Sequence, residues 1–92
     1  MNGIELIAEE RKRQLEEKGW TLDFDQAHTN QELAGAAKSY LDHYIYKTPS
    51  YPFYWPFDIS WWKPDNSKTR LRDLVKAGAL IAAEIDRITR NS

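Results

Sequence analysis

The chain of 92 residues contains no cysteine, which excludes disulfide bonds and thiolate metal sites. Its four glycines are scattered at positions 3, 19, 35 and 78, so the sequence has no glycine-rich phosphate loop. A Gly-x-Ser-x-Gly elbow is also missing, and no nucleophilic triad is therefore predicted. No apolar run approaches the roughly 20 residues that a membrane-spanning helix needs.

Neither sign of charge dominates, since 13 basic and 14 acidic side chains give a formal net charge of −1. This balance argues against duplex nucleic acid as a partner, because domains that bind it are usually clearly basic. The charges are unevenly spread, however, and residues 63–76 hold five basic side chains against two acidic ones. Such a patch fits a small anionic ligand better than a duplex, although an ordinary solvated helix start has the same composition.

Length and composition predict a single helical domain over residues 1–92, near the lower size limit for a self-sufficient core. A hydrophobic content of 41% and a charged content of 29% are typical of a folded globular chain. Met1, Asn2 and Gly3 lead directly into a charged amphipathic segment, so no secretory signal is expected. Together with the lack of cysteine, this favours a cytoplasmic location.

Apolar residues that recur every three or four positions predict an all-α domain of three to four helices. We expect a first helix over residues 3–18 and a second over residues 30–46. Thr29 and Glu32 match a capping box at the start of the second helix. The third helix is expected to begin at position 67 or 69 and to end near position 89.

The residues expected to face the core share this helical spacing on each of the three helices. They are Ile4, Ile7, Ala8, Arg11 and Leu15 on the first, Leu33, Ala34, Ala37, Tyr40, Leu41, Tyr44 and Ile45 on the second, and Leu71, Leu74, Val75, Gly78, Ile81, Ala82, Ile85 and Ile88 on the third.

Small residues lie in the middle of the third helix. A glycine inside a helix costs about 1 kcal/mol relative to alanine, so Gly78 indicates close packing against another helix. Ala77, Ala79, Ala82 and Ala83 widen the face on which such an approach is possible. A face this wide favours completion of the core by a second copy, and we expect a homo-oligomer.

Ten of the twelve aromatic residues fall within residues 40–62. Pro52, Pro56 and Pro64 interrupt the later part of this segment and exclude a long helix or an interior strand. We therefore expect a long ordered loop between the second and third main helices, with one helical turn around residues 57–62.

The end of the aromatic segment and the basic helix start that follows it form the candidate ligand site. Aromatic rings stack on flat ligands, basic side chains bind phosphate, and a helix start adds free N–H groups. The proposed stacking residues are Trp55, Trp61 and Trp62, and the proposed phosphate-binding residues are Lys63, Arg70, Arg72 and Lys76. Alternatively, the rings cover the open end of a helical bundle and the cations are merely solvated.

Other candidate residues are better explained by structural roles. Asp23, Asp25 and His28 lie close together in a loop, but capping and loop hydrogen bonds explain them better than a metal ion does. His43 lies among tyrosines, and we expect it to be half-buried beside a tyrosine hydroxyl. No metal site, cofactor or catalytic residue is predicted.

Several motifs cover most of the chain: Glu10-Arg11-Lys12-Arg13-Gln14, Gly19-Trp20-Thr21, Asp25 with His28, Glu32-Leu33-Ala34, Trp61-Trp62-Lys63-Pro64 and Arg72-Asp73-Leu74-Val75-Lys76-Ala77-Gly78-Ala79-Leu80-Ile81. Together they resemble a widespread family of small phage and prophage proteins. The resemblance implies a phage-encoded factor that acts in the cytoplasm of an infected bacterium.

A more distant resemblance is to the all-α nucleotide pyrophosphohydrolases of the MazG-like kind. Enzymes of that kind hold magnesium with Glu-x-x-Glu on one helix and Glu-x-x-Asp on another. Here neither signature is complete, and the acidic residues available for it are Glu5, Glu9, Glu32 and Glu84. Metal-dependent hydrolysis of a nucleotide is therefore kept as an alternative function.

The pattern of rings and cations favours a non-catalytic protein that binds a nucleotide-type signal. In a phage setting this suggests a sponge, which sequesters a nucleotide second messenger of host defence. A further alternative is a protein–protein inhibitor that uses the aromatic loop as its hot spot.

Overall fold

The computed structural model describes residues 1–16, 31–47 and 55–90, and these residues form helices and no strands. Helix α1 spans Gly3–Glu16, α3 spans Glu32–Tyr46 and α4 spans Leu71–Arg90, and the short 3-10 helix η1 spans Ile59–Trp61. The predicted all-α class is confirmed. The turn η1 also lies where the sequence predicted one helical turn.

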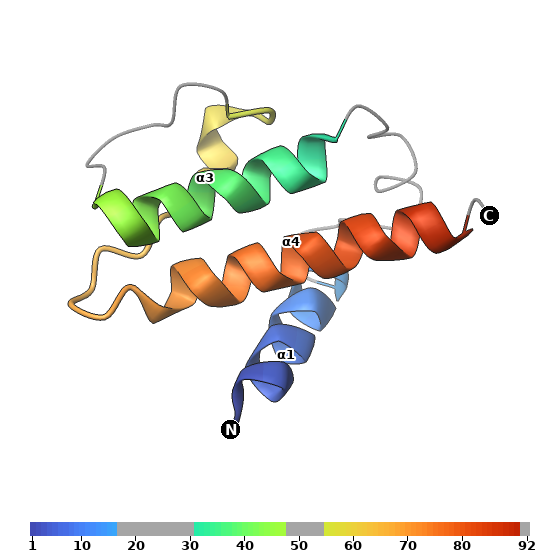
Figure 1. The fold of residues 1–92 in the computed structure, drawn as a ribbon, viewed down its shortest axis with the longest axis horizontal. Helices are drawn as coiled ribbons and strands as arrows, with labels where there is room; N and C mark the ends of the chain where they lie inside the picture. The colour runs from blue at the N-terminus through green and yellow to red at the C-terminus, as the bar shows by residue number, and fades with distance from the viewer. Residues whose placement is uncertain (17–30, 48–54, 91–92) are drawn as a thin grey trace.

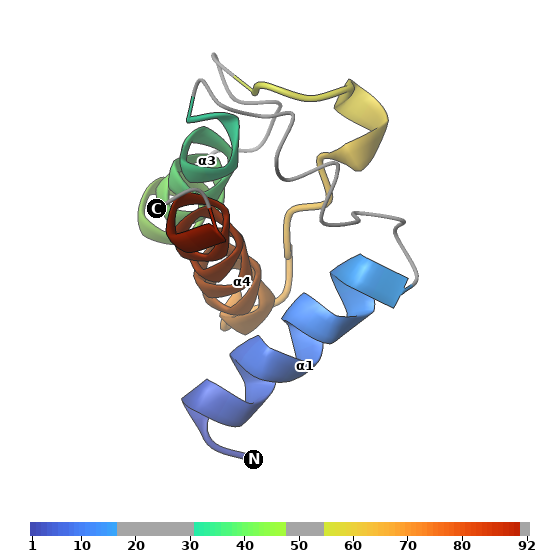
Figure 2. The ribbon, with the colours of Figure 1, turned by 90° about the vertical axis from the view of Figure 1, so that its right-hand side faces the viewer.

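Helices α3 and α4 lie side by side along most of their lengths (Figure 1). Helix α1 crosses α4, and both α1 and η1 lie on the same side of the α3–α4 pair (Figure 2). The segment that connects η1 to α4 runs between the α3–α4 pair on one side and α1 and η1 on the other (Figure 2). The first half of α4 therefore has α3 on one side and α1 and this connecting segment on the other.

The core between α3 and α4 combines large buried residues with several alanines. Leu33 and Leu80 are fully buried. Ala36 and Ala37 on α3 and Ala77 and Ala83 on α4 are also buried in this cluster. Because alanine adds little bulk, the two helices can approach closely, as the small residues of the third helix predicted.

Of the stripe predicted on α4, Val75 is buried, but four of the large aliphatic residues expected to face the core do not. Leu71, Ile81, Ile85 and Ile88 are each about half exposed, with exposed fractions of 48%, 44%, 54% and 53%. The buried face of α4 instead comprises Asp73, Val75, Ala77, Ala79, Leu80, Ala83 and Glu84. The expected close packing at Gly78 is confirmed, since a Cβ there would lie 2.5 Å from Ile7 Cδ1.

Helix α1 buries polar side chains, of which Arg11 was predicted to face the core and Glu10 and Gln14 were not. Its buried residues are Glu10, Arg11 and Gln14, whereas Ile4 is 82% exposed. Glu10 and Arg11 can be buried in this way because they form ion pairs with Arg72 and Asp86 of α4. The apolar contact of α1 with α4 is centred on Ile7.

The helix starts differ from the expected ones for local reasons. Gln31 has a φ of 68°, so α3 begins at Glu32 rather than at position 30, and the predicted partner Thr29 lies outside the described residues. A reciprocal capping box is present on α1 instead. There Glu5 N–H donates to Asn2 Oδ1 and Asn2 N–H donates to Glu5 Oε1, both at 2.9 Å.

Helix α4 begins at Leu71, later than the expected position 67 or 69. Arg70 has a φ of 51° and cannot belong to the helix. The helix start is stabilised by Asp65, whose carboxylate accepts hydrogen bonds from the N–H groups of Ser67 at 2.8 Å and Arg72 at 2.9 Å. These hydrogen bonds lower the pKa of Asp65.

Candidate functional site

Glu10 connects α1 to α4 and organises one side of the candidate site. Its carboxylate accepts hydrogen bonds from Arg13 Nε at 2.9 Å and from Arg13 Nη2 at 2.6 Å. It also accepts from Arg72 Nη2 at 2.6 Å and from Gln14 Nε2 at 3.3 Å. Only 1% of the Glu10 side chain is exposed, against 33% for Arg13 and 41% for Arg72. A buried carboxylate thus fixes the positions of two partly exposed guanidinium groups.

Two opposing effects determine the ionisation of Glu10. Burial raises the pKa of its carboxyl group, because a charge loses solvation there. The hydrogen bonds from Arg13 and the positive charges of Arg13, Arg72 and Lys76 lower it, and together they outweigh burial. The net pKa of Glu10 lies below its ordinary value, so the carboxylate remains charged and can hold both arginines near neutral pH.

Tyr40 organises the opposite side. Its hydroxyl donates to Trp61 O at 3.4 Å and accepts from Lys63 N–H at 3.2 Å. Lys76 Nζ donates to Lys63 O at 2.6 Å and lies 5.5 Å from the centroid of the Tyr40 ring. These contacts tie the backbone of residues 61–63 to α3 and α4.

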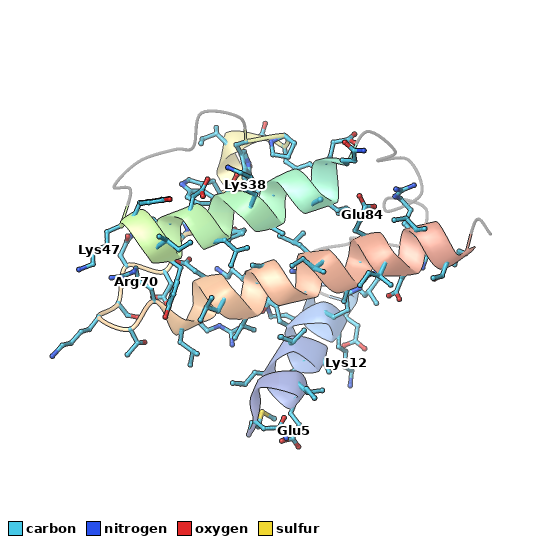
Figure 3. All side chains as sticks on the ribbon, viewed as in Figure 1. Glu5, Lys12, Lys38, Lys47, Arg70 and Glu84 are labelled. Atoms are coloured by element: carbon cyan, nitrogen blue, oxygen red, sulfur yellow. The ribbon has the colours of Figure 1, made fainter. Side chains whose placement is uncertain are left out.

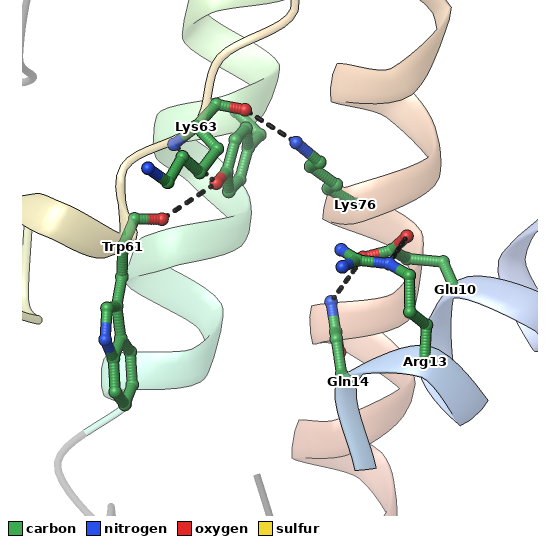
Figure 4. Close-up of a pocket in the computed structure, with 7 residues that line it drawn as sticks. Glu10, Arg13, Gln14, Trp61, Lys63 and Lys76 are labelled. Carbon is green, nitrogen blue, oxygen red and sulfur yellow. Dashed lines mark hydrogen bonds and ion pairs between the residues drawn. The ribbon is translucent and has the colours of Figure 1, made fainter. Parts of the chain in front are cut away.

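A recess lies between these two sides. It is lined by Glu10, Arg13, Gln14, Tyr40, Trp61, Lys63 and Lys76. Figure 4 shows Gln14, Arg13 and Glu10 on one side and Trp61 and Lys63 on the other. The recess has a volume of about 20 Å³, enough for one small group such as a water molecule.

An open groove adjoins the recess. Its volume is about 320 Å³, and Glu10 and Arg13 line both spaces. The other residues that line the groove are Glu9, Lys12, Glu16 and Arg72. A ligand that reaches into the recess would extend along a surface that carries Arg13, Lys12 and Arg72.

Four of the seven residues predicted to bind a ligand lie around these two spaces. Trp61, Lys63 and Lys76 line the recess, and Arg72 lines the groove. Trp61 and Lys76 are partly buried, and the Lys63 side chain is exposed. Sequence reasoning missed the contribution of α1. Glu10, Arg13 and Gln14 have the i, i+3, i+4 spacing of one helix face, but this spacing predicts a buried face only when the residues are apolar.

Trp55 belongs to the core cluster, and Trp62 is partly buried and packs against it, as Trp61 also does. Trp55 is 7% exposed, and its Nε1 donates to Asp58 O at 2.9 Å. Ring centroids are 5.1 Å apart between Trp55 and Trp62 and 4.8 Å apart between Trp62 and Tyr40. These two tryptophans therefore stack on other rings of the protein, as in the alternative interpretation of the sequence.

Arg70 is separated from the recess. Its Nε donates to Tyr44 O at 3.2 Å, and its guanidinium lies 5.8 Å from the centroid of the Tyr44 ring. Figure 3 shows Arg70 near Lys47 at one end of the molecule, away from Lys12 on α1. Arg70 thus holds the end of α3 against the start of α4.

His43 has a different partner from the expected one. It is buried, and its Nδ1 lies 2.5 Å from Asp73 Oδ2 rather than beside a tyrosine hydroxyl. Asp73 is also fully buried, and its Oδ1 accepts from Asp65 N–H at 2.8 Å. This pair joins α3 to α4 in the interior and does not line the recess.

The glutamates of the alternative hydrolase function lie on three helices. Within residues 1–16, 31–47 and 55–90, no three Asp, Glu or His side chains form a group that could hold a metal ion. Glu5 caps α1, and Glu84 accepts from Arg87 Nε at 2.6 Å. Figure 3 shows Glu5 and Glu84 far apart.

The remaining candidates, Asp23, Asp25 and His28, lie outside the described residues. Among the helices of the described part, none is long and apolar enough to cross a membrane. Comparison of the chain with protein-family models, with curated proteins and with solved structures found no match.

Proposed function

We propose that this protein binds a small anionic, nucleotide-type ligand without converting it, at the recess and the adjoining groove. The observation that carries the proposal is the position of Trp61, Lys63 and Lys76 around one recess, beside the guanidinium groups of Arg13 and Arg72. A nucleotide needs a surface for its base and positive charges for its phosphate, and both are available here within one small area.

The distribution of charge supports the proposal. Glu10 is enclosed by its hydrogen-bond donors, whereas Arg13 and Arg72 remain a third or more exposed at the groove. A phosphate in the groove could therefore approach guanidinium groups whose positions are already fixed by Glu10. Such preorganisation lowers the entropy cost of binding.

The biological setting of the proposal comes from the resemblance to small phage proteins. A phage protein that binds a nucleotide signal in the host cytoplasm would lower the free concentration of that signal. We therefore propose a sponge for a nucleotide second messenger of anti-phage defence. Pyrophosphohydrolysis and protein–protein inhibition are the competing functions.

Isothermal titration of the full chain against a panel of cyclic and linear nucleotides tests the proposal. At least one of them should bind, and Lys63→Gln should weaken that binding by about tenfold because a charge-assisted contact is lost. Lys68→Gln is the matched control, since Lys68 is an exposed lysine of the same connecting segment and does not line the recess.

The outcomes separate the candidate functions. A sponge returns its ligand unchanged when the complex is denatured after incubation with Mg²⁺, whereas a hydrolase releases a product. Failure of every nucleotide to bind would refute the proposal. Retention of a host protein in that case would favour the inhibitor.

A second proposal concerns association with another copy of the chain. Ile81, Ile85 and Ile88 of α4 are spaced by four and three residues, as in helices that pack against each other. Leu71, Ile81, Ile85 and Ile88 remain about half exposed on this face. A face of this kind can pair with its own copy about a two-fold axis, so we propose a homo-oligomer that buries the outer face of α4.

A further inference from the structure

The groove beside the recess carries as many acidic side chains as basic ones. Its described lining consists of three basic and three acidic side chains: Lys12, Arg13, Arg72, Glu9, Glu10 and Glu16. The formal charges of this lining therefore cancel. Lys63 and Lys76 add positive charge at the recess but do not line the groove. The two spaces together suit one localised negative charge better than a row of them.

The two guanidinium groups of the groove have only a small positive excess between them. Glu10 accepts from Arg13 Nη2 and from Arg72 Nη2, both at 2.6 Å, so one negative charge is shared by two positive ones. The Glu10 side chain is 1% exposed, whereas Arg13 is 33% and Arg72 41% exposed. A phosphate in the groove therefore meets the guanidinium groups rather than the Glu10 carboxylate, and a single negative charge balances them.

The other two carboxylates lie on either side of these cations along α1. Glu9 precedes Lys12 and Arg13, and Glu16 follows them, in each case by three or four residues. Residues at these spacings are neighbours on a helix face. Both glutamates are exposed and line the groove. At 1.5 Å per residue they are about 10 Å apart along the helix, so a chain of phosphates that extends from Arg13 along α1 approaches a carboxylate in either direction.

We infer that the groove selects nucleotides with isolated phosphodiester groups over nucleotides with a chain of phosphates, through repulsion by Glu9 and Glu16. This inference rests on the proposed nucleotide-binding function. A phosphodiester carries one negative charge, which the guanidinium pair balances. A terminal phosphate carries about 1.5 to 2 negative charges near neutral pH, and each further phosphate of a chain adds more. That excess charge lies beside Glu9 or Glu16, and like charges at close range disfavour binding.

Nucleotides that differ in their phosphate groups test this inference on the unmodified chain. The phosphodiester ligands are the 3′,5′-cyclic monophosphates and the cyclic dinucleotides of adenosine and of guanosine. The comparison ligands are the 5′-triphosphates of the same nucleosides. Isothermal titration is carried out without divalent cations, because Mg²⁺ would neutralise the phosphate chain. We expect at least one phosphodiester ligand to bind about tenfold more tightly than the triphosphate with the same base.

Substitution of the two glutamates separates the effect of charge from that of ligand size. Glu9→Gln and Glu16→Gln each remove one negative charge and leave the side-chain volume almost unchanged. Each should raise the affinity for the triphosphate by about threefold and the double variant by about tenfold, because exposed charge pairs are individually weak. The affinity for the phosphodiester ligands should change by less than about threefold in the double variant.

Asp42→Asn is the matched control. It removes the same charge from a partly exposed carboxylate of α3 that lines neither space, and it should leave the affinity for the triphosphate unchanged. A gain in this control equal to that in Glu9→Gln and Glu16→Gln would show that only the net charge of the protein matters, and would refute the role of the two glutamates.

The inference and the proposed function fail in different ways. Triphosphates that bind the unmodified chain as tightly as the phosphodiester ligands overturn the inference, and so does a preference that persists in the double variant. Both results leave nucleotide binding intact. Failure of every nucleotide to bind refutes the proposed function and the inference together.

Discussion

At the scale of single residues, Tyr40 connects α3 to the segment around η1 through both its ring and its hydroxyl. Its ring contacts Trp55 and Trp62, and its hydroxyl links the backbone of Trp61 and Lys63. Burial raises the pKa of Tyr40 to about 12, because a phenolate would lose its solvation, and the hydrogen bond from Lys63 N–H lowers the pKa only in part.

This pKa predicts a loss of stability in alkaline solution. The folded-state pKa of Tyr40 is raised above its ordinary value of 10.0, so its contribution is complete below that pH and is lost as the pH rises towards about 12. In that interval the free energy of unfolding should fall by about 1.4 kcal/mol per pH unit. Urea denaturation at several pH values from 9 to 12 measures this slope.

Tyr40→Phe should be less stable at neutral pH and should lose this slope. Tyr46→Phe is the control, since Tyr46 is 70% exposed, and it should retain the slope of the original chain. A slope of the same size in both variants would show that another group causes it.

The pair of His43 and Asp73 shows why single-residue roles were hard to predict. The two residues lie 30 positions apart in the sequence and meet only when α3 packs on α4. Nearby tyrosines made a hydroxyl partner for His43 plausible, but proximity in sequence carried no information about the opposite helix. The role of Tyr40 in the core was easier to anticipate, because it followed from the helical spacing of α3.

At the scale of elements, the two glycines of α3 and α4 offer a direct comparison. A Cβ at Gly78 would lie 2.5 Å from Ile7 Cδ1 and 2.9 Å from Ile7 Cγ1. A Cβ at Gly35 would meet only Pro56 Cγ at an ordinary distance of 3.9 Å. Both residues lie inside helices, so alanine gains the same helix propensity at each.

Gly35→Ala should therefore raise the free energy of unfolding by about 1 kcal/mol. Gly78→Ala should lower it by about 1–2 kcal/mol, because Ile7 has to move and the contact of α1 with α4 is disturbed. Thermal and urea denaturation of the two variants measure the difference. Equal stabilisation by both substitutions would mean that α1 does not pack closely at Gly78.

The existence and type of the main helices could be predicted from their periodicity, and their described ends agree within a few residues. The buried faces of α1 and α4 could not. Hydrophobic periodicity assumes that a helix buries its apolar side within its own chain. Glu10 instead pairs with Arg72, 62 positions away, while the isoleucines of α4 stay exposed.

As with the fold, only part of the candidate site could be predicted from the sequence. Trp61, Lys63, Arg72 and Lys76 follow one another closely in the sequence, and the structure places all four at adjoining spaces. Trp55 could not be distinguished from them, because composition does not show which ring faces inwards. Gln14 and Arg13 were missed, since their proximity depends on how α1 crosses α4.

At the scale of the whole molecule, the exposed face of α4 predicts self-association. Sedimentation equilibrium of the chain should give a mass of at least two copies. Ile85→Glu should shift the mass to that of a single chain, because a charge would be buried in the interface. Ile45→Glu is the control, since Ile45 is 59% exposed but lies on α3.

A single-chain mass for the original protein would contradict this prediction. If Ile45→Glu dissociates the assembly and Ile85→Glu does not, the contact lies on α3 instead. Circular dichroism of both variants shows whether each retains its helices, so that dissociation is not confused with unfolding.

The polar attachment of α1 also has a thermodynamic consequence. Glu10 and Gln14 come from α1, so half of the recess exists only while that helix is docked on α4. A ligand that contacts both halves binds only when α1 is docked on α4. Its binding free energy therefore adds to the stability of the docked arrangement. Binding of a ligand in the recess should therefore slow amide hydrogen exchange along α1 more than along the α3–α4 core. The exchange rates of α1 would then reveal whether the ligand is bound.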